Sequence, residues 1–176
     1  MMTGEMIHKL NHLISKLNDL DIVIILGVSP SLTLFQLHFP PLTSPSQGTN
    51  DLGSRLHPSV VLQNIEHLHK IVHDLSTHQH PVYSVAVSIP FCGWPTVNDT
   101  ARREINDGIR SYAQRNELKV AFLDADELLG AEKDRLREAF WGPDRVHLSE
   151  AGYDQLGSAL YDVIVAFLSN KFKKEK

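Results

Sequence analysis

Residues 21–27 read Asp-Ile-Val-Ile-Ile-Leu-Gly, and this short stretch decides what kind of fold the chain can adopt. Residues 22–26 form a continuous run of isoleucine, valine and leucine, with no polar residue at alternate positions. A strand that covers a core on one face only alternates apolar and polar residues, whereas an uninterrupted apolar run is typical of a strand buried on both faces of a parallel sheet. The stretch therefore predicts a parallel sheet with helices on both faces.

Strands and helices alternate along the rest of the chain. Apolar runs predict two more strands, over residues 82–89 and 119–123. Apolar residues spaced three and four apart, with capping residues before them, predict helices over about 3–17, from Pro58, from Asp99 or Thr100, over about 131–140 and after Ser149. This order predicts an α/β fold of three layers, helix, parallel sheet and helix, with a site at the C-terminal ends of the strands.

Composition excludes several classes of protein. A chain of 176 residues with 42% hydrophobic content can form one domain with a substantial core. Its net charge of −4 leaves no basic stripe for nucleic acid, and the lone Cys92 excludes an internal disulfide framework. The sequence shows neither a signal peptide nor an apolar run long enough to span a membrane. A cytoplasmic protein of one domain is therefore the default expectation.

An acid and an imidazole stand three residues apart before the last predicted helix, in Asp144-Arg-Val-His147. An aspartate that accepts a hydrogen bond from one ring nitrogen fixes the histidine tautomer. The other nitrogen can then take a proton from a hydroxyl nucleophile. The same pattern also occurs as a turn with a solvated histidine, so the pair alone leaves both interpretations open.

A second motif, Gly48-Thr-Asn50-Asp51, follows the first predicted strand after an interruption. The side-chain amide of an asparagine beyond a buried strand can donate a hydrogen bond to a developing oxyanion. Asn50 and Asp144 are both expected just beyond strand ends, where the site of an open α/β sheet lies.

Together and in this order, the two motifs resemble those of the SGNH, or GDSL-type, ester hydrolases. The third block of that family reads Gly-x-Asn-Asp after a hydrophobic strand, and its last block reads Asp-x-x-His. The resemblance extends over most of the chain, through residues 21–27, 85–90, 122–126 and 147–153. It implies a flavodoxin-like α/β/α fold and transfer of an acyl group from a small-molecule carboxylic ester, or a related acyl compound, to water. No metal or cofactor is implied.

The resemblance also assigns roles to four residues. His147 corresponds to the general base and Asp144 to its orienting partner. Asn50 corresponds to an oxyanion donor, and Gly48 to the glycine that lets the backbone turn tightly beside it.

Two blocks of the family pattern are incomplete. Gly-Asp-Ser, which carries the nucleophile, does not occur in the 176 residues, and the glycine of the second block is also absent. The resemblance therefore implies a domain that is incomplete at its N-terminus and lacks its first strands. Strand 22–26 would then be a sheet edge through which the chain self-associates. Two hypotheses follow: an ester hydrolase whose nucleophile block is missing from this chain, which is inactive as written, or a noncatalytic binding or vestigial protein derived from the family.

Residues 28–47 interrupt the third block and differ in composition from the rest of the chain. They contain Pro30, Pro40, Pro41 and Pro45 but no charged residue and no glycine. They show neither helical nor strand periodicity, so we expect this segment to be disordered. Removing it joins Gly27 to Gly48 and restores an uninterrupted block, which favours a retained in-frame intron over a genuine surface insertion.

Five histidines lie on the helix predicted from Pro58 and just beyond its end: His67, His69, His73, His78 and His80. Only His69 and His73 share a helical face, so a zinc site would need ligands that the sequence does not place. Solvated histidines are therefore expected.

Overall fold

The computed structural model describes residues 21–26, 52, 55–74, 76–77, 81–91, 93, 95, 97–130 and 138–174. In chain order its elements are β1 (Asp21–Leu26), α3 (Pro58–Asp74), β2 (Val82–Val87), α4 (Asp99–Arg115), β3 (Val120–Leu123), α5 (Ala125–Leu129), the 3-10 helix η2 (Glu138–Phe140) and α6 (Glu150–Lys174). The predicted helix over 3–17 and the predicted insertion over 28–47 lie outside the described residues, as does most of the helix predicted over 131–140.

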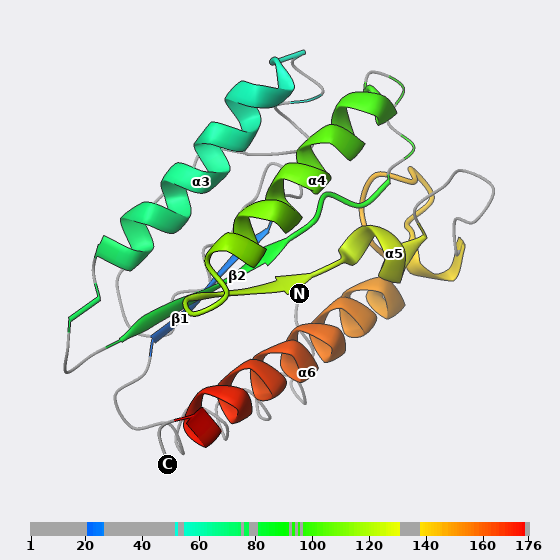
Figure 1. Cartoon of the computed structure of the whole chain (residues 1–176). Helices are drawn as coiled ribbons and strands as arrows, with labels where there is room; N and C mark the ends of the chain where they lie inside the picture. Colours follow the sequence, from blue (N-terminus) through cyan, green and yellow to red (C-terminus); the bar gives the residue numbers. More distant parts are fainter. Residues whose placement is uncertain are drawn as a thin grey trace.

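The three described strands form one parallel sheet in the order β1-β2-β3. Figure 1 shows α3 and α4 on one side of this sheet and α6 on the other. The predicted α/β fold with a parallel sheet between helices is therefore confirmed. Among the described strands β1 pairs with β2 alone, and the predicted self-association through its other side stays a prediction.

Alternate residues of β2 and β3 belong to the two different cores, because side chains along a strand point to opposite faces. On β2, Val85 and Val87 pack in the core that α6 covers, whereas Ala86 packs in the core under α3 and α4. The apolar residues of α6 that line the first core recur at spacings of three and four: Leu156, Leu160, Ile164, Phe167 and Leu168. The helix predicted after Ser149 from apolar residues at this spacing is confirmed, and these residues cover the sheet.

Capping side chains fix where the helices begin. The Ser149 hydroxyl accepts a hydrogen bond from the backbone N–H of Gly152 at 3.1 Å, as the sequence predicts. Asn98 caps α4 by accepting from the N–H of Ala101 at 3.2 Å, so this helix begins at Asp99. Helix α5 is not predicted from the sequence, since its five residues are too few to show a helical period.

The prediction of solvated histidines on α3 is wrong for His69. Its side chain is fully buried, and its Nδ1 lies 2.8 Å from the Ser84 hydroxyl of β2. That hydroxyl also lies 2.9 Å from Nε2 of the half-buried His73. His69 is buried because it follows Val61 and Ile65 at spacings of four, on the helix face that covers the sheet. His67, by contrast, is exposed as expected.

The burial of His69 predicts a loss of stability in mild acid. Burial, and after it the neighbouring His73, lowers the pKa of His69 from 6.5 to about 3. Between these two values the unfolded chain binds a proton that the folded chain does not, so stability falls as pH falls through this window. The other groups that face His69 are the uncharged Ser84 and Tyr112. We expect the free energy of unfolding to drop by about 2 kcal/mol through His69 between roughly pH 7.5 and pH 5.

Denaturant unfolding at these two pH values measures the total loss, to which His73 also contributes because burial lowers its pKa from 6.5 as well. His69→Phe should reduce it, and His67→Phe, which changes an exposed ring on the same helix, is the control. The depressed pKa values of Asp99 and Asp124 lie below 3.8, so their contributions are already complete in this window. An unchanged pH dependence in His69→Phe would contradict the assignment.

Candidate active site

The loop between η2 and α6 is held closed by its own backbone. Trp141 and Leu148 form an antiparallel bridge, and the N–H of Gly142 donates to the carbonyl of His147 at 2.7 Å. Arg145 donates back to the carbonyl of Gly142 at 2.9 Å and adopts a left-handed backbone conformation with a φ of 56°. Residues 141–148 therefore form a compact turn that presents the side chains between its ends.

Asp144 and His147 form a hydrogen-bonded pair on this turn. One carboxylate oxygen of Asp144, Oδ2, lies 2.6 Å from Nδ1 of His147. The other, Oδ1, accepts the backbone N–H groups of Val146 and His147, each at 3.0 Å. The Asp-x-x-His spacing thus brings the acid and the imidazole into the contact that the motif predicts, although both side chains are more than half exposed, at 52% and 58%.

These contacts fix the protonation of the pair. The hydrogen bond from the His147 side chain, then those from the backbone N–H groups, hold the pKa of Asp144 well below its usual range. An ionised carboxylate can only accept, so Nδ1 of His147 must carry the proton. In the neutral imidazole Nε2 is then a bare acceptor, and the described residues give it no hydrogen-bond partner. The arrangement offers a proton acceptor at an exposed position.

The turn adjoins the sheet through the segment that follows β2. The N–H of Gly93 donates to the carbonyl of Arg145 at 2.6 Å. Arg145, the residue after Asp144, is therefore held beside the segment that follows β2, and along the chain Asp144 follows the 3-10 helix η2 and not a strand.

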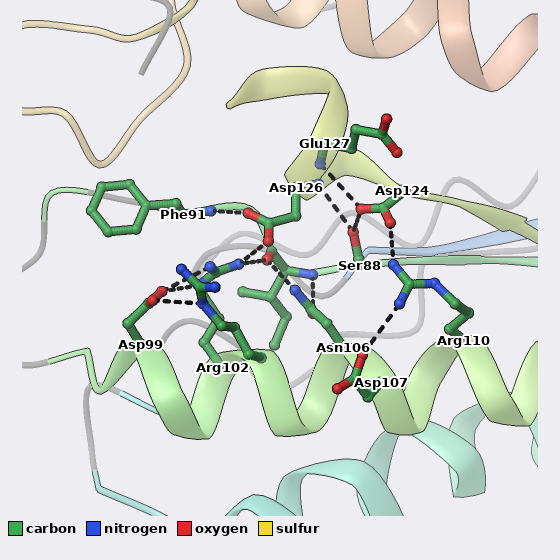
Figure 2. Close-up of polar contacts among 12 residues, drawn as sticks. Ser88, Phe91, Asp99, Arg102, Asn106, Asp107, Arg110, Asp124, Asp126 and Glu127 are labelled. Atoms are coloured by element: carbon green, nitrogen blue, oxygen red, sulfur yellow. Dashed lines mark hydrogen bonds and ion pairs between the residues drawn. The ribbon is translucent and has the colours of Figure 1, made fainter. Parts of the chain in front are cut away.

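A polar network occupies the C-terminal ends of β2 and β3 (Figure 2). Ser88 directly follows β2 and donates to Oδ1 of Asp124, which directly follows β3, at 2.9 Å. The other oxygen of Asp124 forms an ion pair with Arg110 of α4. Burial alone would raise the pKa of Asp124, but the backbone N–H of Glu127 and the Arg110 and Ser88 side chains lower it. The two strand ends are thus joined through an ionised carboxylate.

Arg102 of α4 lies at the centre of this network and is 0% exposed. Its guanidinium pairs with Asp99 at 2.7 Å and with Asp126 at 2.6 Å, and it donates to the carbonyl of Ile89 at 2.8 Å. Asn106, one helical turn later, accepts from the N–H of Ile89 at 2.7 Å and donates to its carbonyl at 2.8 Å. Both backbone groups of one residue beyond β2 are therefore bound by α4.

The sequence predictions cover this site only in part. Asp144 and His147 are brought together, whereas Asn50 and Gly48 lie outside the described residues. The network residues were not predicted as part of the site: Ser88, Arg102, Asn106, Asp124 and Asp126.

A signal for two of the network residues is present in the sequence. Arg102 precedes Ile105 by three residues, and Asn106 precedes Ile109 by three, so both polar residues share the buried face of α4 with these isoleucines. A polar residue on an apolar face requires a buried partner, and this requirement points to them.

Within the described ranges, no three histidine, cysteine or acidic side chains gather as a metal site would require. Of the helices described in the structure, none has both the length and the apolar character needed to cross a membrane.

The fold is that of known esterases. An aryl esterase from M. smegmatis superposes with a TM-score of 0.53 and 20% sequence identity, over 91% of this chain and 67% of the esterase. Est24, a carbohydrate acetylesterase from Sinorhizobium meliloti, gives a TM-score of 0.54 and 20% identity, over 92% of this chain and 67% of that one. Comparison with curated protein sequences gives no match.

The family follows from the sequence match. The model of the GDSL-like Lipase/Acylhydrolase family matches residues 9–155, which include the Asp144 and His147 pair and the network around Arg102. The chain therefore belongs to this family, and the resemblance to SGNH ester hydrolases is confirmed.

Proposed function

We propose that this protein is a serine ester hydrolase of the SGNH type that cleaves small-molecule carboxylic esters. The observation that carries the proposal is the Asp144 and His147 pair, in which the carboxylate holds the proton on Nδ1 and leaves Nε2 as the base. Aryl esters and acetylated sugars are the first substrates to test, because the two similar structures are named an aryl esterase and a carbohydrate acetylesterase. A cytoplasmic location stays a prediction of the sequence.

The reaction uses the pair twice. His147 Nε2 takes the proton of a serine hydroxyl as its oxygen attacks the ester carbonyl, and the imidazolium then gives that proton to the leaving alcohol. Water, activated by the same nitrogen, hydrolyses the acyl enzyme and regenerates the serine. Asn50 donates its side-chain amide to the oxyanion of each tetrahedral intermediate, and Gly48 allows the backbone to turn beside it.

We also propose that the 176-residue chain contains no serine that His147 can activate. Gly-Asp-Ser does not occur in it. Ser88 donates to Asp124 and accepts from the N–H of Asp126 at 3.1 Å. Ser149 donates to the carbonyl of Ala139 at 2.5 Å and caps α6. Ser29, Ser31, Ser44, Ser46 and Ser54, which are among the serines outside the described residues, lie in or near the segment 28–47 and lack the strand-to-helix turn pattern that exposes a nucleophile.

The second candidate function is binding of an ester or related acyl compound without turnover. The commitment of Ser88 and Ser149 to structural hydrogen bonds favours it for this chain. Sequencing the transcript would show whether an upstream reading frame encodes a Gly-Asp-Ser segment. Finding one would favour the hydrolase over the binding protein.

Ester hydrolysis by the 176-residue chain tests the missing nucleophile. The chain and its His147→Ala variant should hydrolyse a short-chain aryl ester at equal rates, because the base has no serine to activate. Circular dichroism checks that both are folded. A clear loss of turnover in the variant would reveal a nucleophile in this chain, which labelling with a fluorophosphonate would then identify.

A further inference from the structure

The segment after β2 and the turn that carries Asp144 and His147 meet with no space between them. A Cβ atom placed on Gly93 would lie 2.6 Å from Cβ of Arg145 and 3.3 Å from its carbonyl oxygen. Real Cβ atoms do not approach another carbon this closely, so one of the two backbones would have to move. Arg145 immediately follows Asp144 and precedes His147 by two residues. A side chain at residue 93 would therefore press on the residue that lies between the acid and the base in the sequence.

The segment that carries Gly93 is itself anchored at alternate residues. Asn106 binds both backbone groups of Ile89. The N–H of Phe91 donates to Oδ1 of Asp126 at 2.9 Å, and the other oxygen of Asp126 pairs with the buried Arg102. Gly93 continues the series by donating to Arg145. Ile89 and Phe91 are thus bound by side chains of α4 and α5, and Gly93, two residues later, binds the turn that carries Asp144 and His147.

The turn has less support of its own on this side. Arg145 adopts its left-handed φ of 56° although it is not a glycine, a conformation that costs free energy for residues with a Cβ. Its side chain pairs with Glu138 at 2.9 Å, but both side chains are more than half exposed, at 56% and 78%, so this ion pair contributes little. The Gly93 contact is therefore a substantial restraint on this part of the turn.

We propose that Gly93 is a positioning residue for the catalytic pair: its lack of a side chain and its N–H hold the backbone at Arg145 where Asp144 and His147 keep their contact. The catalytic consequence of this proposal rests on the proposed function. If the chain catalyses ester hydrolysis, a misplacement of the pair by about 1 Å can cost 100-fold in rate. Its structural part concerns the hydrogen bond from Nδ1 of His147 to Asp144 and holds whether or not the chain is active.

The test is the tautomer of His147, read from the nitrogen chemical shifts of its imidazole in the ¹⁵N-labelled 176-residue chain near neutral pH. The unsubstituted chain should show mainly the Nδ1–H form, because Asp144 accepts that proton. Gly93→Ala should shift these resonances and lower the fraction of the Nδ1–H form. In a version that contains the nucleophile segment, the same change should lower kcat about 100-fold with little change in KM, since the ester contacts are retained.

A second substitution makes the test specific. Arg145→Gly removes the Cβ that an alanine at residue 93 would meet, and glycine adopts a φ of 56° without strain. The Arg145→Gly variant alone should leave the His147 resonances nearly unchanged, and adding it to Gly93→Ala should restore them. This double-mutant cycle isolates the contact between the two residues.

Gly108→Ala is the matched control. A Cβ on Gly108 of α4 would meet the terminal methyl groups of Leu62 of α3, so this variant also adds one methyl group against a neighbouring side chain, although here the neighbour can rotate away. It should leave the tautomer of His147 unchanged, because its contact lies between α3 and α4.

Each outcome decides the proposal. An unchanged His147 tautomer in folded Gly93→Ala would overturn it. So would a Gly93→Ala/Arg145→Gly double variant whose His147 resonances are as shifted, or whose fold is as poor, as in Gly93→Ala alone. A restored tautomer supports it, even if the version with the nucleophile segment proves inactive, in which case only the proposed function fails.

Discussion

Asp144→Asn, in a version of the protein that contains a Gly-Asp-Ser segment, should lower kcat about 10⁴-fold, the size of the loss when the aspartate of another serine triad is made an amide. The geometry gives the reason. Oδ1 of Asp144 accepts two backbone N–H groups at 3.0 Å, so the oxygen of an asparagine would be kept there. Its NH₂ group would then face Nδ1 of His147. That nitrogen would have to accept, and the proton would move to Nε2, the position that has to be bare for catalysis.

Two measurements check this result together. Turnover of an aryl acetate gives the loss in kcat, and the imidazole nitrogen shifts show whether the tautomer has inverted. Asp144→Ala is the control, because it removes the carboxylate without forcing a tautomer. An asparagine variant that keeps the Nδ1–H form, or loses less than about tenfold in kcat, would contradict the role given to Asp144.

The largest effect on stability is expected from Arg102→Met. Arg102 is 0% exposed, and its loss would leave the carboxylate of Asp126, whose side chain is only 14% exposed, without its ion-pair partner. Removing one member of a buried ion pair costs about 3–5 kcal/mol, because the remaining charge stays away from water. For a domain of this size the melting temperature should fall by about 10 °C.

Arg103 provides a matched comparison on the same helix. It also binds Asp99, at 2.8 Å, but its side chain is 53% exposed. Arg103→Met should therefore cost less than about 1 kcal/mol. Thermal and urea unfolding of the two variants measure the difference, and equal losses of stability would show that burial of Arg102 does not decide its contribution.

The framework of the fold could be predicted because it depends on patterns that are local in the sequence. Residues 22–26 predict a doubly buried parallel strand, and the structure pairs β1 in parallel with β2. Ser149 predicts the start of α6 for a similar reason, since a capping side chain binds a backbone N–H three residues away. The Asp144 and His147 contact is equally local, and its geometry follows from the turn that joins the two residues.

The parts that could not be predicted depend on partners distant in the chain. His69 appears solvated in a histidine-rich segment, and only its spacing of four from Ile65 indicates the buried face, where Ser84 of another element supplies its hydrogen bond. Arg102 and Asp126 belong to different elements, and nothing near either residue shows that the two charges meet. The contact of Gly93 with Arg145 likewise requires the folded arrangement of two loops.

The two hydrogen bonds between the Asn106 side chain and the backbone of Ile89 restrict where this chain can gain or lose residues. One amide binds the N–H and the carbonyl of a single residue, so an inserted or deleted residue before Ile89 would offer α4 a different residue. The same holds as far as Phe91, whose N–H is bound by Asp126. Changes in length are therefore confined to the stretch between Gly93 and the Asn98 cap of α4. That stretch begins beside the turn that carries Asp144 and His147, so a change in its length can leave the contact between these two residues in place.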